Sequence, residues 1–255
     1  MPTDTATALL PEPPPPGKEW AVFFDVDGCL LEIAERPDEV VVAPGLVDAL
    51  ARLREQLNGA VALVSGRSLG NLDGLFAPLH LPAAGQHGLE RRDATGRLLP
   101  LAILPAHFAE VEARLALFAD RHPGTLLERK SRGLALHFRG APHCAEEAQR
   151  LGIALAERTD PPLVAVPGKA VIELRAPGSN KGTAIEAFLK EPPFQGRTPA
   201  FFGDDVTDED GFAAVNRLGG HSILVGHRPT QARWALPDVA AVHRWIATAS
   251  VERSS

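Results

Sequence analysis

The sequence of 255 residues has only two cysteines, Cys29 and Cys144, and they lie far apart in the chain. Two cysteines do not build the disulfide framework of a small secreted domain, so we expect reduced thiols and a cytoplasmic protein. No apolar run approaches the roughly 18 residues that a membrane-spanning helix needs. The first residues have neither a basic start nor a long apolar stretch, so we expect no secretory signal there.

Basic blocks are also absent, and the net charge is −6 with an isoelectric point near 5.9. This balance argues against nucleic acid as the main partner. We also expect no membrane partner, and a monomer that acts on a small molecule. Lysine is much rarer than arginine in this sequence. We therefore expect a lysine here to serve somewhat more often than usual through its compact ammonium group. The lysines are Lys18, Lys130, Lys169, Lys181 and Lys190.

Three segments are predicted along the chain. Residues 1–18 are rich in proline and are predicted to form a flexible tail. After them, short apolar runs alternate with helical patterns, which predicts an α/β core with a doubly wound, mostly parallel sheet resembling the Rossmann fold. Residues 101–176 instead combine two helical patterns with alternating segments, typical of an inserted α+β module. The predicted core strands lie at 21–24, 61–64, 199–202 and 223–225, within a core of 19–100 and 177–255.

Three of these four strands end in chemically active residues. Asp25 and Asp27 follow the first strand, Ser65 and Gly66 the second, and Asp204 and Asp205 the third. Because ligands bind beyond the carboxyl ends of parallel strands, these groups should converge. Crowded carboxylates repel one another unless a cation neutralises them, and a hard cation such as Mg²⁺ does so together with phosphate oxygens.

Each of these groups fits a role in phosphoryl transfer. Asp25 can attack phosphorus as a nucleophile, and Asp27 can then serve as general acid and base. Ser65 and Gly66 would bind a phosphate oxygen. Lys181 opposes the dipole of the helix that it opens, unless it completes a phosphate site there. Asp208 has two interpretations: it helps to cap the next helix, where Thr207 and Asp210 resemble a capping box, or with Asp205 it orients the metal site.

The ordered set Asp25-x-Asp27-Gly28, Ser65, Lys181 and Gly203-Asp204-Asp205 resembles the four motifs of the haloacid-dehalogenase-like phosphohydrolases. The resemblance implies an Mg²⁺-dependent phosphatase with an aspartyl-phosphate intermediate. It also implies that the metal ligands are the Asp25 carboxylate, the Asp27 main-chain carbonyl and Asp204. Cys29 departs from the threonine that is usual after the glycine, and we expect this change to be tolerated.

The inserted module should select the substrate. Residues two or four apart on a strand share a face, so Glu128 and Lys130, His137 and Arg139, and Lys169 and Glu173 would form a polar stripe. Such a stripe suits a ligand with many hydroxyl groups, although an ordinary solvated sheet face has the same pattern. In the core, the loop around Gln86 and His87 also follows an expected strand, and a histidine in such a loop is more often structural.

Together with Ser65-Gly66-Arg67 and Gly203-Asp-Asp-x-Thr-Asp-Glu209, these segments resemble the trehalose-6-phosphate phosphatase family. The resemblance implies hydrolysis of trehalose 6-phosphate to trehalose and phosphate. It further implies that insert residues hold the distal glucose and that a second group of residues contacts the substrate more weakly. The first group is Glu128, Lys130, Lys169 and Glu173, and the second is Arg67, Gln86, His87 and Arg139.

Three other functions share features with this sequence. A phosphatase for another sugar phosphate would have the same core chemistry. A receiver domain also uses an acidic pair and a lysine, but it lacks an insert of this size and a second acid two places after the nucleophile. A sugar-phosphate sensor without activity would not need Asp25, Asp27, Lys181 and Asp204 intact, and a phosphate-release assay distinguishes it.

Overall fold

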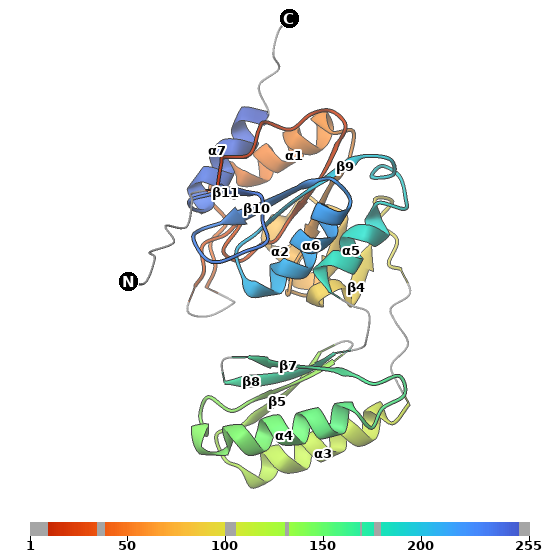
Figure 1. Ribbon diagram of the computed structural model, residues 1–255, viewed down its shortest axis with the longest axis vertical. Helices are drawn as coiled ribbons and strands as arrows, with labels where there is room; N and C mark the ends of the chain where they lie inside the picture. Colours follow the sequence, from red (N-terminus) through yellow and green to blue (C-terminus); the bar gives the residue numbers. More distant parts are fainter. Residues whose placement is uncertain are drawn as a thin grey trace, which may run out of the picture. The chain divides into compact units, whose positions relative to one another are not determined.

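A computed structural model describes residues 10–34, 39–99, 106–130, 133–168, 170–175 and 180–249, the side chains of Lys130 and Ala249 excepted. The chain divides into two compact units (Figure 1). The first comprises residues 1–99 and 180–255, and the second comprises residues 100–179. Each unit has its own hydrophobic core, so each is described by itself.

The first unit contains, among the described residues, a seven-stranded sheet in the order β11-β10-β9-β1-β2-β3-β4. All neighbouring pairs are parallel except β3 and β4. Strand β1 is fully buried between β9 and β2, as expected for a strand covered on both faces. The strands are β1 Trp20–Phe24, β2 Val61–Val64, β3 Ala83–Gly85, β4 Glu90–Arg92, β9 Thr198–Gly203, β10 His221–Val225 and β11 Trp234–Leu236.

Helices cover this sheet, and two helix pairs pack together, α1 with α7 and α5 with α6. Helix α1 is amphipathic, since Leu46, Leu50 and Leu53 are buried along one side. The predicted α/β core with a mostly parallel sheet is therefore confirmed. The helices are α1 Leu46–Gln56, α2 Leu69–Phe76, α5 Lys181–Phe188, α6 Glu209–Arg217 and α7 Val239–Ala249, with short 3₁₀ turns η1 Gln86–Gly88 and η3 Val206–Asp208.

Part of the predicted flexible tail is held in place. The carbonyl of Pro11 accepts a hydrogen bond from the Ala235 amide at 3.0 Å, and the indole of Trp245 donates to the Pro14 carbonyl at 3.0 Å. Pro13 is buried. The prediction was therefore wrong for residues 10–18, because proline carbonyls remain good acceptors and proline rings bury apolar surface. Residues 1–9 lie outside the described part.

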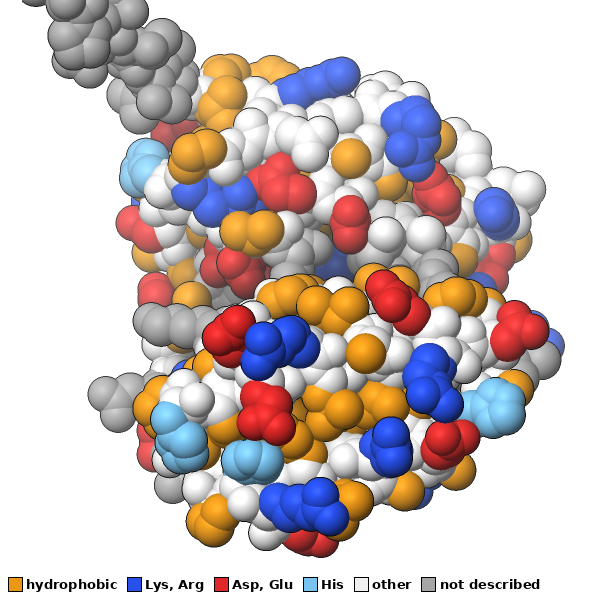
Figure 2. Space-filling model, turned by 60° about the horizontal axis from the view of Figure 1, so that its bottom comes forward, with side chains coloured by type: hydrophobic (Ala, Val, Ile, Leu, Met, Phe, Trp, Pro, Cys, Tyr) orange, Lys and Arg blue, Asp and Glu red, His pale blue; other side chains and the backbone are white. Residues whose placement is uncertain are grey.

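The second unit is a four-stranded sheet of order β5-β6-β8-β7, antiparallel throughout, with two helices. Leu134, Leu136, Ile172 and Leu174 are fully buried and share their core with α3 and α4. Figure 2 shows acidic and basic side chains interspersed over the outer face of these helices. The elements are α3 Phe108–Arg121, β5 Leu126–Lys130, β6 Gly133–His137, η2 Pro142–Cys144, α4 Ala145–Ala156, β7 Val164–Gly168 and β8 Val171–Arg175.

The hairpin between β7 and β8 differs from the sequence pattern in one detail. Pro167 and Gly168, residue types that are rare inside strands, belong to β7, and Ala170 takes the positive φ of 65° that the turn requires. Proline is tolerated there because β7 is an edge strand, with a side that needs no hydrogen-bond donor. Within the described residues, no helix is long and apolar enough to cross a membrane.

Candidate active site

Asp25 follows directly after β1 at the carboxyl end of the central strand, and its side chain is nearly buried. The ammonium of Lys181, the first residue of α5, lies 3.0 Å from Asp25 Oδ1. Burial raises the pKa of Asp25, and the charge of Lys181 opposes that effect. The pKa of Lys181 is itself raised, since burial lowers it less than Asp25 and Asp208 raise it. Lys181 therefore stays an ammonium beside the predicted nucleophile.

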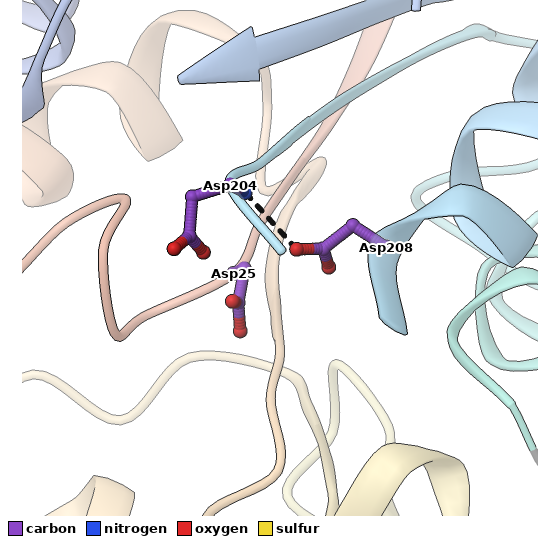
Figure 3. Close-up of side chains that lie close together, drawn as sticks. All are labelled: Asp25, Asp204 and Asp208. Carbon is purple, nitrogen blue, oxygen red and sulfur yellow. Dashed lines mark hydrogen bonds between the residues drawn. The ribbon is translucent and has the colours of Figure 1, made fainter. Parts of the chain in front are cut away.

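Asp208 supports both the lysine and the loop after β9. Its Oδ1 accepts from Lys181 Nζ at 2.5 Å, while Oδ2 accepts from the amides of Asp204 and Asp205 at 3.0 and 2.9 Å. Figure 3 shows Asp25, from the end of β1, close to Asp204 and Asp208, which both come from the segment after β9. This geometry combines the two interpretations of Asp208: its bonds support the site, and its bond from the Asp205 amide also makes it part of a helix cap.

The prediction that Thr207 and Asp210 form a capping box was wrong. Asp205 has an extended backbone and caps the short turn η3 instead, with its side chain accepting from the Val206 amide at 2.6 Å. The capping box is formed by Asp205 and Asp208, because η3 precedes α6 and moves the start of the helical segment towards the amino terminus.

A close approach at Gly28 brings the first loop against Asp204. Gly28 has a φ of +76°, and a Cβ at this position would lie 2.0 Å from Asp204 Oδ2. Only glycine meets both requirements. The neighbouring Cys29 is fully buried, and burial together with the nearby carboxylates raises the pKa of its thiol. Cys29 therefore fills space in the core.

The acidic cluster fits a hard divalent cation. Carboxylate oxygens of Asp25, Asp204 and Asp208 lie within 4.8 Å of one another. Burial and the charge of Asp208 raise the pKa of Asp204 to about 6, and among the described residues its buried Oδ1 has no hydrogen-bond partner. An unsatisfied buried carboxylate oxygen is costly unless a ligand occupies it. Both oxygens of Asp208 accept hydrogen bonds, from Lys181 and two amides, whereas the ion pair of Asp25 with Lys181 involves Oδ1. Asp204 and Asp25 are therefore the better candidates for holding a metal.

Asp27 is paired with Arg67 rather than with the other acids. Arg67 Nε lies 2.7 Å from Asp27 Oδ2, and Nη2 lies 2.6 Å from Oδ1, a two-pronged ion pair. Asn71 in α2 accepts from Nη1 of the same guanidinium at 2.6 Å. Arg67, which we expected to contact substrate, thus orients the predicted general acid.

Ser65 and the loop around His87 form one hydrogen-bonded unit. Ser65 is fully buried, and its Oγ accepts from the Arg67 amide at 3.2 Å. The His87 amide donates to the Ser65 carbonyl, and the Gln86 amide donates to the Arg67 carbonyl, both at 2.9 Å. A Cβ on Gly66 would lie 2.9 Å from His87 Nε2, so the glycine leaves room for this ring. The residues of this loop thereby position the Ser65 turn.

The second unit carries part of the predicted polar stripe. Glu128 and Glu173 lie on either side of Ala135 in register, and therefore share a face of the sheet. His137 Nε2 lies 2.9 Å from Glu128 Oε2, and Arg175 Nε lies 3.7 Å from Glu173 Oε2. Arg139 is exposed just after β6. Lys169 and the side chain of Lys130 lie outside the described residues.

Two groups near the site were not singled out by sequence reasoning. Glu90 accepts from the Leu69 amide at 2.9 Å and from Gln86 Nε2 at 3.0 Å, so it ties the Gln86 loop to the start of α2. Arg228 contacts the loop of Asp204 and Asp205. Its position was a usable signal, because Arg228 follows β10, the fourth predicted core strand, in the way that the other site residues follow theirs.

Comparison with known proteins agrees with this geometry. A family model described as trehalose-phosphatase matches residues 23–240. The trehalose-6-phosphate phosphatase of Escherichia coli (strain K12) is 42% identical over 240 residues, which cover 94% of this chain and 90% of that protein. A probable trehalose-phosphate phosphatase of Sinorhizobium fredii is 43% identical over 230 residues, 89% of this chain and 86% of the relative.

The fold has solved counterparts as well. The C-terminal domain of the trehalose-6-phosphate phosphatase of C. albicans superposes with a TM-score of 0.77 at 22% identity, covering 91% of this chain and 93% of that one. At this identity the likeness concerns the fold alone. The match of the family model over most of the chain, and these relatives, show that the chain belongs to the trehalose-phosphatase family.

Proposed function

We propose that this protein is a phosphoric monoester hydrolase that converts trehalose 6-phosphate to trehalose and phosphate. The observation that carries the proposal is the buried Asp25 beside Lys181 and Asp204 at the carboxyl end of β1. Phosphate monoesters hydrolyse extremely slowly without a catalyst, so a site for them needs both a nucleophile and cationic groups. The activity named for its relatives, which match nearly the whole chain, supports the same substrate.

Magnesium is the proposed cofactor. The Asp25 and Asp204 carboxylates and the main-chain carbonyl of Asp27 would hold it, as the family resemblance implies. Bound Mg²⁺ neutralises charge on the phosphoryl group that is being transferred. Lys181 supplies a second positive charge at the same place, and Ser65 and Gly66 would bind a phosphate oxygen.

Asp25 and Asp27 would divide the chemistry into two steps. An Asp25 carboxylate oxygen attacks phosphorus, the bond from phosphorus to the sugar oxygen breaks, and Asp27 gives its proton to that oxygen. Water then attacks the aspartyl phosphate, Asp27 accepts a proton from it, and phosphate leaves with the Asp25 carboxylate restored. The two-pronged bond from Arg67 orients Asp27 and suits its state as a proton acceptor in the second step.

The second unit is proposed to act as a cap that selects the sugar. Glu128 and Glu173, on one face of its sheet, offer acceptors for hydroxyl groups, and Lys130, Lys169 and Arg139 would add donors. Arg67, Gln86 and His87 remain proposed as weaker substrate contacts from the first unit. A cytoplasmic location and a monomeric state stay predictions from composition and cysteine usage.

A phosphate-release screen tests this function. Trehalose 6-phosphate, sucrose 6-phosphate, glucose 6-phosphate and p-nitrophenyl phosphate are each assayed with Mg²⁺ and with a chelator. We expect the highest kcat/KM for trehalose 6-phosphate, loss of activity in the chelator, and no turnover by Asp25→Asn. A preference for another sugar phosphate would keep the reaction and overturn the substrate, whereas no Mg²⁺-stimulated release from any ester would overturn the proposal as a whole.

A further inference from the structure

The guanidinium of Arg228 lies against the back of the loop that carries Asp204. Nε donates to the Asp204 carbonyl at 2.7 Å, and Nη2 donates to the Asp205 carbonyl at 2.6 Å. Nη1 donates to Glu209 Oε1 and, at 2.9 Å, to the Pro229 carbonyl. Four of the five guanidinium N–H groups are thus engaged on a side chain that is only one-fifth exposed.

Glu209 is in turn fixed by the segment that follows Arg228. Its Oε1 accepts from the Thr230 hydroxyl at 2.7 Å, and its Oε2 accepts from the Gln231 amide at 2.9 Å. Burial raises the pKa of Glu209, but these bonds and Arg228 together lower it below its ordinary value. The first residue of α6 therefore stays a carboxylate and locks the arginine in one orientation.

The loop of Asp204 and Asp205 is consequently held from both sides. Its two amides donate to Asp208, and its two carbonyls accept from Arg228. Among the described residues, Oδ1 of Asp204 has no hydrogen bond of its own. Without one, the position of that oxygen depends on the backbone that carries it.

From this arrangement we infer that Arg228 is a positioning residue for the metal site: it fixes the Asp204 backbone so that the Asp204 carboxylate is preorganised for the cation. The inference rests on the proposed function only in taking Asp204 as a metal ligand. Arg228 donates to the main-chain carbonyls of Asp204 and Asp205 and not to the Asp204 carboxylate. It therefore does not compete with the metal for that carboxylate. Removing a group that orients a metal ligand typically costs about 10–100-fold in metal affinity.

The test measures metal binding without substrate, using Mn²⁺ as a spectroscopic probe in electron paramagnetic resonance titrations of the full chain. Arg228→Ala should raise the Mn²⁺ dissociation constant by roughly 10–100-fold. Arg228→Lys should recover part of the loss, because one ammonium replaces some of the bonds. Arg217→Ala is the matched control, since this arginine of α6 is largely exposed and pairs with Glu186. The Mn²⁺ dissociation constant of Arg217→Ala should stay within about twofold of the wild-type value.

Activity gives a second readout. Phosphate release by Arg228→Ala should need more Mg²⁺ for half-saturation, and high Mg²⁺ should return kcat and the KM for trehalose 6-phosphate towards wild type. A residue that only stabilised the fold would lower the melting temperature and leave the Mn²⁺ titration unchanged. If Arg228→Ala does not fold, Glu209→Gln, which loosens Arg228, should weaken Mn²⁺ binding in the same direction and by less.

Two results overturn the inference. One is a folded Arg228→Ala variant, or a folded Glu209→Gln variant if Arg228→Ala fails to fold, that binds Mn²⁺ as tightly as wild type. The other is a wild-type chain that binds no Mn²⁺, which also removes the metal from the proposed function. A wild-type chain that binds Mn²⁺ and loses affinity in Arg228→Ala, yet releases no phosphate, upholds the inference and contradicts only the proposed function.

Discussion

At the scale of single residues, the site depends on one very close approach, that of Gly28 to Asp204. Gly28→Ala adds a methyl group 2.0 Å from Asp204 Oδ2 at a φ of +76°. We expect Asp204 to be displaced and the Mg²⁺ concentration for half-maximal phosphate release to rise by about tenfold or more. The measurement is an Mg²⁺ titration of activity with matched circular dichroism spectra.

Gly96→Ala separates the clash from the backbone strain. Gly96 has a φ of +84°, but among the described residues nothing lies within 4 Å of the position that an alanine methyl would take there. Both variants carry the cost of a positive φ for alanine, and only Gly28→Ala meets a carboxylate. Equal Mg²⁺ requirements in the two variants would contradict a role for Gly28 in positioning Asp204.

The sequence predicts those residues of the site that directly follow a core strand. Asp25, Ser65 and Asp204 each follow a short apolar strand, so parallel pairing alone predicts that they meet. The partners of these groups were not predictable in the same way. That Arg67 binds Asp27, and that Arg228 binds the Asp204 loop, depends on side-chain directions across 40 and 24 residues of chain.

At the scale of elements, β4 is tied to α2 by Arg92 and Asp73, whose two N–O distances are both 2.7 Å. Hydrogen bonds from Arg92 lower the pKa of Asp73 below its ordinary 3.8. A lowered carboxyl pKa means that the pair stabilises the fold above pH 3.8 and that this contribution is lost as the pH falls through the lower, folded-state value.

Asp73→Asn should therefore lower the free energy of unfolding by about 1 kcal/mol near neutral pH, and by progressively less below about pH 4. Urea unfolding at several pH values measures the difference. Glu32→Gln, which changes an exposed carboxyl group in the loop after β1, serves as the control with little effect on the free energy of unfolding. If the loss of unfolding free energy in Asp73→Asn grew as the pH fell, the ion pair with Arg92 would not be its cause.

The sheet of the second unit supports a separate prediction about recognition. Glu173→Ala should lower kcat/KM for trehalose 6-phosphate by roughly 10–100-fold, the cost of one hydrogen bond to a charged group. Glucose 6-phosphate and p-nitrophenyl phosphate lack the distal ring, so their turnover should hardly change. Arg150→Ala on the exposed side of α4 is the control. An equal loss on all three esters would remove Glu173 from sugar recognition.

At the scale of the whole molecule, the sequence pattern separates a parallel α/β core from an α+β insert because their periodicities differ. The insert was placed at 101–176, and the second unit comprises residues 100–179. The packing of residues 10–18 was not foreseeable, since a proline-rich composition does not reveal that Pro11 and Pro14 carbonyls meet β11 and α7. Strands β4 and β11 were also missed, since three residues are too few for an alternation pattern.

In the proposed mechanism, Asp25 carries the phosphoryl group during turnover. The most direct measurement is to quench the enzyme during hydrolysis of trehalose 6-phosphate, reduce any acyl phosphate with borohydride, and map the modified residue by peptide mass spectrometry. We expect reduction of Asp25 to homoserine, dependent on substrate and Mg²⁺, with Asp27 and Asp204 unmodified. Substrate-dependent reduction at another aspartate, or turnover without any reduced residue, would contradict it.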